Sequence, residues 1–249
     1  MLKLRLGSTD IDVSPFGLGT VKWGRNEGVH YPAAFQLPTD TELLALLAET
    51  KSLGINLLDT APAYGVSEER LGKLLQGQRQ DWILSSKAGE DFIQGQSHFD
   101  FSSQAIHRSV ERSLQRLQTD YLDILLIHSN GEDQKIIEEH AVFVTLQQLK
   151  TAGKIRAFGL SSKTVAGGLL TIDHADVAMV TYNPLHTEER AVIRYAQQKQ
   201  KGIFIKKAFA SGHLLNTSEV LQFIFSEPGV TSVILGTINP KHLRENVEG

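Results

Sequence analysis

Residues 122–161 decide the fold, because they hold two buried strands and a helix between them. Residues 122–127 (LDILLI) are an apolar run of strand length, and residues 155–161 (IRAFGLS) form a second one. Between them, residues 142–150 are helical in pattern and stop at Gly153, a residue favoured just after helix ends. A strand, a helix and a strand in this order predict two parallel strands joined by a covering helix.

The same alternation continues in both directions along the chain and makes eight strand–helix units. The other expected strands are residues 14–19, 56–59, 82–87, 177–182, 203–206 and 232–235. The other expected helices are residues 39–53, 67–75, 102–117, 163–170, 188–201, 219–226 and 240–247. Eight units within 249 residues match the α/β class and a closed (β/α)8 TIM barrel. The alternative is an open doubly wound sheet, but no G-x-G-x-x-G follows any strand.

Residues 2–13 precede this series and hold two short strand-like pieces around Gly7 and Ser8. We expect them to form an N-terminal β-hairpin that closes the barrel floor. Thr39 and Glu42 have the spacing of a capping box at a helix start. No linker, charge run or repeat divides the chain, so we expect one barrel domain over residues 1–249.

Composition excludes several kinds of chemistry. The chain has no cysteine, which removes disulfides, thiolate metal sites and a cysteine nucleophile together. A formal net charge of −3 provides no basic footprint for nucleic acid. No apolar stretch approaches the roughly 18–20 residues of a membrane span, and the first residues lack the apolar run of a signal peptide. We expect a cytoplasmic protein, a monomer or weak oligomer, whose partner is a small molecule rather than nucleic acid or a membrane.

Four polar residues lie at the ends of three consecutive expected strands. Asp59 and Tyr64 follow the second strand, Lys87 ends the third and His128 follows the fourth. TIM-barrel sites lie at these ends, and adjacent strands are about 4.8 Å apart, so the side chains can converge. The set suits proton transfer to a carbonyl oxygen, because a Lys87 cation held by Asp59 lowers the pKa of Tyr64 from about 10. His128 would orient the substrate oxygen, and a cofactor must supply a hydride.

The loops after the seventh and eighth strands offer a phosphate site. Barrels often bind phosphate there, beside a helix N-terminus. Asn239 is a favoured helix cap and Pro240 a favoured first helical residue, although turn chemistry alone also accounts for this pattern. The candidate cofactor-binding residues of these loops are Ser211, Gly212, Leu214, Gly236, Thr237 and Asn239.

Three stretches of the sequence resemble the aldo-keto reductases. They are residues 54–75 (GINLLDTAPAYGVSEERLGKLL), the end of residues 114–128 (TDYLDILLIH) and the end of residues 230–246 (GTINPKHLREN). The resemblance implies a catalytic tetrad of Asp59, Tyr64, Lys87 and His128, with Tyr64 as general acid and base. It also implies an NAD(P)(H)-dependent oxidoreductase that interconverts an alcohol and the carbonyl group of an aldehyde, ketone or sugar. NADPH is the expected cofactor, with NADH as the alternative.

The resemblance also implies further cofactor contacts along the chain. The residues concerned are Gly19, Thr20, Val21, Ser161, Ser162, Lys206, His242, Glu245 and Asn246.

Three positions depart from the family pattern around the cofactor. Met179 stands where many members have Gln, and Lys206 stands where an aromatic residue often stacks on the nicotinamide. Ile238 stands where an Arg often pairs with the 2′-phosphate of NADPH. Lys241, His242 or Arg244 could supply that charge instead, and His242 is only weakly cationic near neutral pH.

Three further residues are candidates for the substrate pocket. Trp23 and Tyr31 lie in the long loop after the first strand, and Ser129 follows the fourth strand. Ordinary packing is the alternative for the two aromatic residues. We expect no metal site, because the remaining histidines lack ligand spacing. These are His30, His98, His107, His140, His174 and His186.

Two other functions are open at this point. One is a regulatory subunit on the same fold that binds the cofactor with little or no turnover, since fold alone does not determine function. The intact tetrad argues for the enzyme, while the altered cofactor positions keep the regulatory alternative open. The other is an isomerase or lyase that uses the phosphate site for its substrate, which leaves Tyr64 beside Lys87 unexplained. Asp59 and Lys87 could also form a purely structural ion pair, and His128 a structural hydrogen bond.

Overall fold

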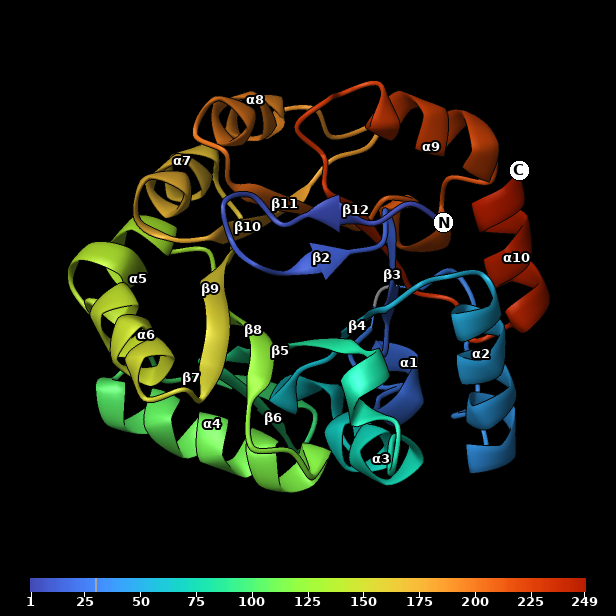
Figure 1. The fold of residues 1–249 in the computed structure, drawn as a ribbon, viewed down its shortest axis with the longest axis horizontal. Coiled ribbons are helices and arrows are strands. Elements are labelled where there is room, and N and C mark those ends of the chain that lie inside the picture. The colour runs from blue at the N-terminus through green and yellow to red at the C-terminus, as the bar shows by residue number, and fades with distance from the viewer. Residues whose placement is uncertain (30) are drawn as a thin grey trace.

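Eight parallel strands form a closed barrel in the computed structural model of this chain, which describes residues 1–29 and 31–249 (Figure 1). His30, one of the histidines considered above, lies outside the described residues. Neighbouring strands follow the order of the chain around the barrel. The strands are β3 (Phe16–Gly19), β4 (Leu57–Asp59), β5 (Ile83–Ala88), β8 (Leu122–His128), β9 (Ile155–Ser161), β10 (Val177–Thr181), β11 (Gly202–Lys206) and β12 (Ser232–Leu235).

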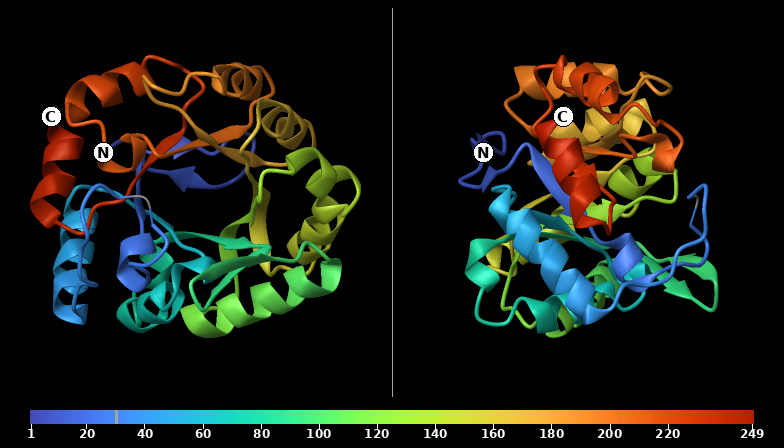
Figure 2. Two further views of the ribbon diagram at one scale, coloured as in Figure 1. Left: turned by 180° about the vertical axis from the view of Figure 1, so that it is seen from behind. Right: turned by 90° about the vertical axis from the view of Figure 1, so that its right-hand side faces the viewer.

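Helices follow the barrel strands and form an outer ring, which Figure 2 shows from behind and from the side. They are α2 (Asp40–Ser52), α3 (Ser67–Leu74), α4 (Ser103–Leu117), α6 (Val142–Thr151), α7 (Val165–His174), α8 (Arg190–Gln198), α9 (Thr217–Phe225) and α10 (Pro240–Glu248). The predicted (β/α)8 TIM barrel is therefore confirmed. Within the described part of the chain, no helix is both long enough and apolar enough to cross a membrane.

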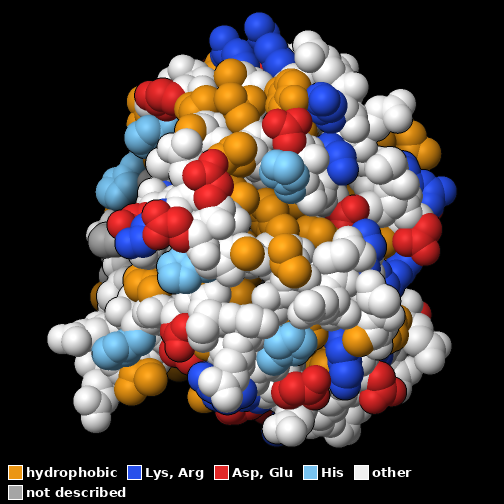
Figure 3. Space-filling view, turned by 90° about the vertical axis from the view of Figure 1, so that its left-hand side faces the viewer, with side chains coloured by type: hydrophobic (Ala, Val, Ile, Leu, Met, Phe, Trp, Pro, Cys, Tyr) orange, Lys and Arg blue, Asp and Glu red, His pale blue; other side chains and the backbone are white. Residues whose placement is uncertain are grey.

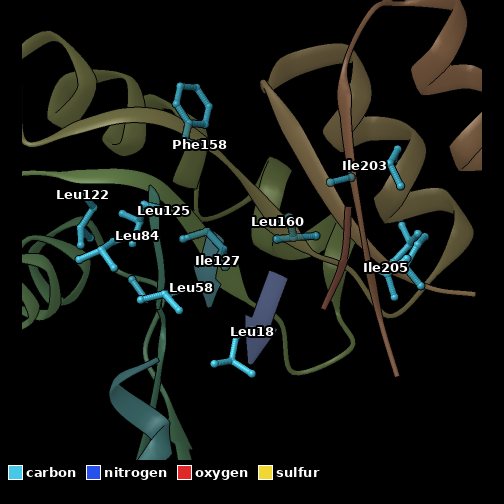
Figure 4. Packing of buried hydrophobic residues seen from close by; sticks show 14 of the residues in the cluster. Leu18, Leu58, Leu84, Leu122, Leu125, Ile127, Phe158, Leu160, Ile203 and Ile205 are labelled. Atoms are coloured by element: carbon cyan, nitrogen blue, oxygen red, sulfur yellow. The ribbon is translucent and has the colours of Figure 1, made fainter. Parts of the chain in front are cut away.

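Residues alternate along each strand between the barrel interior and the surrounding helices. On β8, Ile124 and Leu126 belong to the interior apolar cluster. Their neighbours Leu125 and Ile127 belong to the larger cluster outside, part of which Figure 4 shows. Both faces of the strand are buried, and this explains why LDILLI is a continuous apolar run rather than an alternating one.

The N-terminal hairpin lies across one end of the barrel (Figure 1). β1 (Leu4–Arg5) and β2 (Asp12–Val13) pair antiparallel, and between them Leu6 and Ile11 pack against the interior cluster. Gly7 has φ +56°, and a Cβ there would lie 2.6 Å from the nearest backbone oxygen of the segment before β11. Only glycine allows this close approach. The predicted hairpin at the barrel floor is confirmed.

The capping box at the start of α2 forms as predicted. Thr39 Oγ1 accepts a hydrogen bond from the Glu42 backbone N–H at 3.3 Å. Glu42 Oε2 accepts one from the Thr39 backbone N–H at 2.7 Å. Two otherwise unpaired donors of the first turn are satisfied in this way, and α2 begins at the residue after Thr39.

Several elements lie between the barrel units and were not expected from the sequence. They are α1 (Val21–Gly24), α5 (Asp133–Glu138), the hairpin β6 (Glu90–Ile93) and β7 (Gln96–Phe99), and the 3₁₀ helices η1 (Pro62–Tyr64), η2 (Arg79–Asp81) and η3 (Ala210–Gly212). The β6–β7 hairpin turns through Gln94 and Gly95, both at positive φ, as a two-residue turn requires. β7 is exposed and β6 is mostly half-buried, and neither strand carries an apolar run that would have predicted it.

Candidate active site

The C-terminal ends of β4, β5 and β8 bring the four predicted residues together. Asp59 ends β4, Lys87 lies near the end of the neighbouring strand β5, and His128 ends β8, which is next in the barrel. Tyr64 follows β4 at the end of η1. Its ring centroid lies 6.2 Å from that of His128, with the rings nearly perpendicular, and 4.9 Å from Lys87 Nζ.

Lys87 and Asp59 form a buried ion pair. Lys87 Nζ donates to Asp59 Oδ2 at 2.7 Å and to the Thr60 carbonyl oxygen at 3.0 Å. Ser85 Oγ donates to the other carboxylate oxygen of Asp59 at 3.0 Å. Burial lowers the pKa of Lys87, but attraction to Asp59 and Tyr64 outweighs it and leaves that pKa above its usual value. The amine therefore keeps its charge near neutral pH.

Burial dominates the ionisation of Tyr64. Burial raises the pKa of the phenol more than the Lys87 cation lowers it, so that pKa lies above its ordinary value. The lowered pKa expected from the sequence is therefore wrong here, because that expectation included the charge but not the exclusion of water. Gly65 has φ +62°, and a Cβ there would lie 2.1 Å from the Gly24 carbonyl oxygen. Glycine thus permits the turn that holds Tyr64 in place.

His128 has a partner that the sequence reasoning missed. Its Nδ1 lies 2.6 Å from Oε2 of Glu90, on β6. Burial lowers the pKa of His128 more than Glu90 raises it, and Lys87 and Lys206 lower it further. Burial would raise the pKa of Glu90, but the close contact with His128 helps to lower that pKa to about 2. The only signal was a carboxylate three residues after Lys87, and its approach to His128 depends on the unexpected hairpin.

A second polar cluster adjoins the tetrad. Lys206 Nζ, at the end of β11, donates to Ser161 Oγ at 2.8 Å and to the Ser162 carbonyl oxygen at 2.5 Å. Ser162 Oγ donates to Glu189 Oε1 at 3.1 Å. Ser161 is paired with His128 in the register of β8 and β9. Burial lowers the pKa of Lys206 to about 7, against the attraction of Glu189. The structure thus joins three of the expected cofactor residues through one ammonium group.

The other departures from the family pattern have clear structural settings. Met179 is 2% exposed and belongs to the apolar interior of the barrel. Ile238 packs at the edge of the outer cluster. Arg244 pairs with Glu49 at 2.6 Å and with the carboxylate four residues along α10. Lys241 is 81% exposed, with a carboxylate 3.7 Å away. Among the three basic residues considered as replacements for the missing Arg, Lys241 is the most available cation.

The loop after β12 leads into the N-terminus of α10. Asn239 caps this helix by accepting a hydrogen bond from the Lys241 backbone N–H at 2.9 Å. Thr237 Oγ1 accepts one from the Asn239 N–H at 3.1 Å. A Cβ at Gly236 would meet just one neighbour within 4 Å among the described residues, the Tyr31 hydroxyl at 3.4 Å. Tyr31, expected at the substrate, therefore lies against the loop expected at the cofactor.

The loop after β11 is tightly folded. Ser211 and Gly212 both have positive φ, and the Gly212 N–H donates to the Phe209 carbonyl oxygen at 2.8 Å. The Leu214 N–H donates to the same oxygen at 3.2 Å. These expected cofactor residues therefore shape a compact turn beside the neighbouring β12 loop.

The expected cofactor residues after β3 contribute mainly to the framework in this structure. Thr20 is completely buried, and its Oγ1 donates to the Asp59 carbonyl oxygen at 3.0 Å. Ser67 Oγ donates in turn to Thr20 Oγ1 at 2.8 Å. Gly19 is buried and pairs with Asp59 in the register of β3 and β4, and Val21 begins α1. This segment ties the end of β3 to the tetrad strand.

The expected residues of α10 lie at the surface. His242 and Glu245 are exposed, and Asn246 is half-buried. They share the helix with Lys241.

Two expected substrate residues are buried instead of open to solvent. Trp23 is completely buried and packs in the outer apolar cluster. Ser129 is 1% exposed; its hydroxyl donates to the Asp133 carboxylate and accepts from the Gly131 N–H at 2.8 Å. Asp133 also accepts from the Lys163 N–H at 2.9 Å. Ser129 thus holds the loop after β8 in place, and Trp23 is part of the core in this structure.

No group of three or more potential metal ligands occurs among residues 1–29 and 31–249. On the face seen in Figure 3, histidine side chains are scattered among other side-chain types. A surface cleft of about 480 Å³ is lined by residues of α8 and by residues just after α9. These residues are distant in sequence from the strands that carry the tetrad. Its Arg190 and Arg194 are already paired with the buried carboxylate of Glu227, at 3.2 Å and 2.7 Å. We assign that cleft no ligand.

The fold and the residues at its strand ends define a class of protein. The family model of the aldo/keto reductase family matches residues 15–220. The chain belongs to the aldo/keto reductases, a family of oxidoreductases.

Three relatives illustrate this membership. A Pseudomonas aeruginosa protein assigned to the aldo-keto reductases is 51% identical, with a TM-score of 0.92 over 99% of this chain and 92% of its own. The uncharacterized oxidoreductase YqkF of Bacillus subtilis is 28% identical over 100% of this chain and 90% of its own length. The NADH-specific methylglyoxal reductase of Escherichia coli is 34% identical over 65% of this chain and 52% of its own length.

Proposed function

We propose that this protein interconverts a carbonyl group and an alcohol with NAD(P)(H), using Tyr64 as general acid and base. One observation carries the proposal: the buried Lys87–Asp59 pair, the Tyr64 ring and His128 converge at one end of the barrel. None of these groups is an efficient nucleophile for acyl transfer. Together they suit the delivery of a proton to a carbonyl oxygen.

The ionisation of the tetrad favours a proton donor. Burial keeps the Tyr64 phenol protonated near neutral pH, and the charged Lys87 beside it stabilises the phenolate that remains when the proton leaves. Asp59 holds Lys87 in place through a 2.7 Å hydrogen bond. Proton transfer therefore places negative charge where a fixed positive charge already lies.

The residues present fit a dinucleotide cofactor, which would supply the hydride. The space over Gly236 is open except for the Tyr31 hydroxyl, and the loop leads to a capped helix N-terminus, where anions are stabilised. Ser161, Ser162 and Lys206 provide polar groups beside the tetrad. NADPH is the proposed cofactor and NADH is the alternative. The alternative is supported by one relative, whose name describes it as NADH-specific.

The proposed substrates are small aldehydes, ketones or sugars. The Tyr64 hydroxyl and the His128 ring face the same place, where one oxygen of a carbonyl or hydroxyl group could contact both. The regulatory alternative has no observation in its favour beyond the altered cofactor positions.

Tyr64→Phe tests the proposal, because it removes the proton donor and keeps the ring. Single-turnover hydride transfer should fall by about 10²–10⁴, the usual contribution of general acid catalysis. Tyr121→Phe is the matched control. The Tyr121 ring packs against Arg79, whose guanidinium donates to the Trp82 carbonyl oxygen just before β5, at the end of the strand away from Lys87. The rate of this variant should stay at the wild-type value. Cofactor fluorescence and circular dichroism establish that both variants bind and fold. A folded, cofactor-bound Tyr64→Phe that transfers hydride at the wild-type rate would refute the proposal.

A further inference from the structure

The β6–β7 hairpin lies outside the barrel and brings one carboxylate to the tetrad. Glu90 Oε2 lies 2.6 Å from His128 Nδ1, and the Glu90 side chain is 9% exposed. Its other oxygen accepts a hydrogen bond from Ser97 Oγ, on β7, at 2.6 Å. Both oxygens of Glu90 are therefore occupied, which leaves the carboxylate little freedom to move.

The hairpin is anchored to the turn that carries Tyr64. The Arg25 guanidinium stacks 3.3 Å above the Phe92 ring, and Arg25 Nη1 donates to the Ala63 carbonyl oxygen at 3.1 Å. Asp91, the next residue on β6, pairs with Arg112 of α4. Glu90 thus keeps a defined position relative to Tyr64 as well as to His128.

The two nitrogens of His128 have different environments. Nδ1 is buried and lies 2.6 Å from Glu90 Oε2, although the direction of approach is not that of an ideal hydrogen bond. The His128 side chain as a whole is 21% exposed, so the opposite edge of the ring is the accessible one. An ionised carboxylate at 2.6 Å from Nδ1 requires a proton on that nitrogen, because two lone pairs would repel each other.

We propose that Glu90 is a positioning residue that fixes the proton of His128 on Nδ1 and leaves Nε2 as the nitrogen offered to the substrate. A neutral ring then accepts a hydrogen bond at Nε2, from the hydroxyl of an alcohol. A protonated ring donates one from Nε2, to a carbonyl oxygen. The effect on catalysis rests on the proposed function. If that function holds, a protonated His128 favours reduction at lower pH and a neutral His128 favours oxidation at higher pH.

The charged groups around His128 determine the pH at which the imidazole loses its second proton. Glu90 on β6 opposes the loss of the second proton, while Lys87 on β5 and Lys206 on β11 promote it. Tyr64 packs edge-on against the ring from η1. Glu90 is a negative group in contact with the imidazole, so its removal should lower the pKa of His128 further.

Imidazole NMR tests the inference without any turnover. In ¹⁵N–¹H correlation spectra of the full chain, with His128 assigned by comparison with His128→Asn, the wild-type ring should be the Nδ1–H tautomer when neutral. Glu90→Gln should populate the Nε2–H tautomer and lower the His128 pKa. Glu138→Gln is the matched control, because it removes the same charge from an exposed residue of α5, away from the hairpin, and it should leave both readouts unchanged. A wild-type Nε2–H tautomer overturns the inference, even if Glu90→Gln does not fold.

The pH dependence of single-turnover reduction gives a second readout. Glu90→Gln should move the pH at which the rate falls toward lower pH by the same shift as the His128 titration, with cofactor affinity unchanged. An unshifted profile in a variant whose His128 titration has moved would overturn the positioning role. If the wild-type protein transfers no hydride while its tautomer matches the expectation, the proposed function fails and the pairing of Glu90 with His128 stands.

Discussion

The Lys87 ammonium lies 2.7 Å from the Asp59 carboxylate, and the two side chains are 1% and 5% exposed. Each charge is thus removed from water and compensated by the other. Taking one partner away leaves an uncompensated buried charge, which costs far more than the net value of the pair.

Lys87→Met should therefore lower the free energy of unfolding as well as abolish most activity. The loss should be about 3–5 kcal/mol, since Asp59 would stay buried without its partner. Urea unfolding measures it. The double variant Asp59→Asn and Lys87→Met should lose less than the sum of the two single variants, because neither charge remains. Strict additivity would show that the ion pair is not coupled.

The stability of the protein should depend on pH through Lys206. The pKa of this amine is about 7 in the folded chain and 10.5 in the unfolded chain. Between these values the unfolded chain binds more protons, so the free energy of unfolding rises with pH across the window. Lys206→Met removes this rise. The free energy of unfolding of wild type should therefore increase relative to that of the variant by roughly 1–3 kcal/mol between pH 7 and about 10.

Urea unfolding at several pH values checks this expectation. Lys3→Met removes an exposed amine of the N-terminal segment and serves as the control, with the pH dependence of wild type. If Lys206→Met keeps the same rise with pH, Lys206 titrates normally and is not held by burial.

The preference for NADPH over NADH should be modest. Ile238 cannot pair with a 2′-phosphate, and Arg244 is engaged by Glu49, which leaves Lys241 as the available cation. One charged hydrogen bond contributes roughly 1.5–3 kcal/mol, so the ratio of dissociation constants should be about tenfold to a hundredfold. Lys241→Ala should weaken NADPH and leave NADH unchanged. Fluorescence titration measures both, and a ratio above about a thousandfold would reveal a stronger phosphate site.

Trp23 should act mainly on stability. It is completely buried in the outer apolar cluster, so Trp23→Ala should lower the free energy of unfolding by about 3–5 kcal/mol. Trp23→Phe keeps most of the volume and should lose much less. KM values across an aldehyde panel should stay close to wild type in Trp23→Phe. A large change in KM with unchanged stability would instead indicate that Trp23 lines the substrate pocket.

Much of the fold could be predicted because it depends on patterns among residues that are close together in the sequence. The barrel strands are buried on both faces and therefore appear as short apolar runs such as LDILLI. The helix start at Thr39 and the floor hairpin around Gly7 depend on neighbours close in sequence. The β6–β7 hairpin was missed because its strands pair with each other outside the barrel and mix polar with apolar residues without forming an apolar run.

The sequence by itself determined the barrel and the placement of Asp59, Tyr64, Lys87 and His128 at strand ends, since both follow from periodicity and chain order. Tertiary structure alone decided which further groups these residues meet. The contact of Glu90 with His128 joins a hairpin to a barrel strand, and the raised pKa of Tyr64 reflects the partial removal of its phenol from water by neighbouring elements. Distances and burial of this kind arise from three-dimensional packing, which local sequence patterns do not encode.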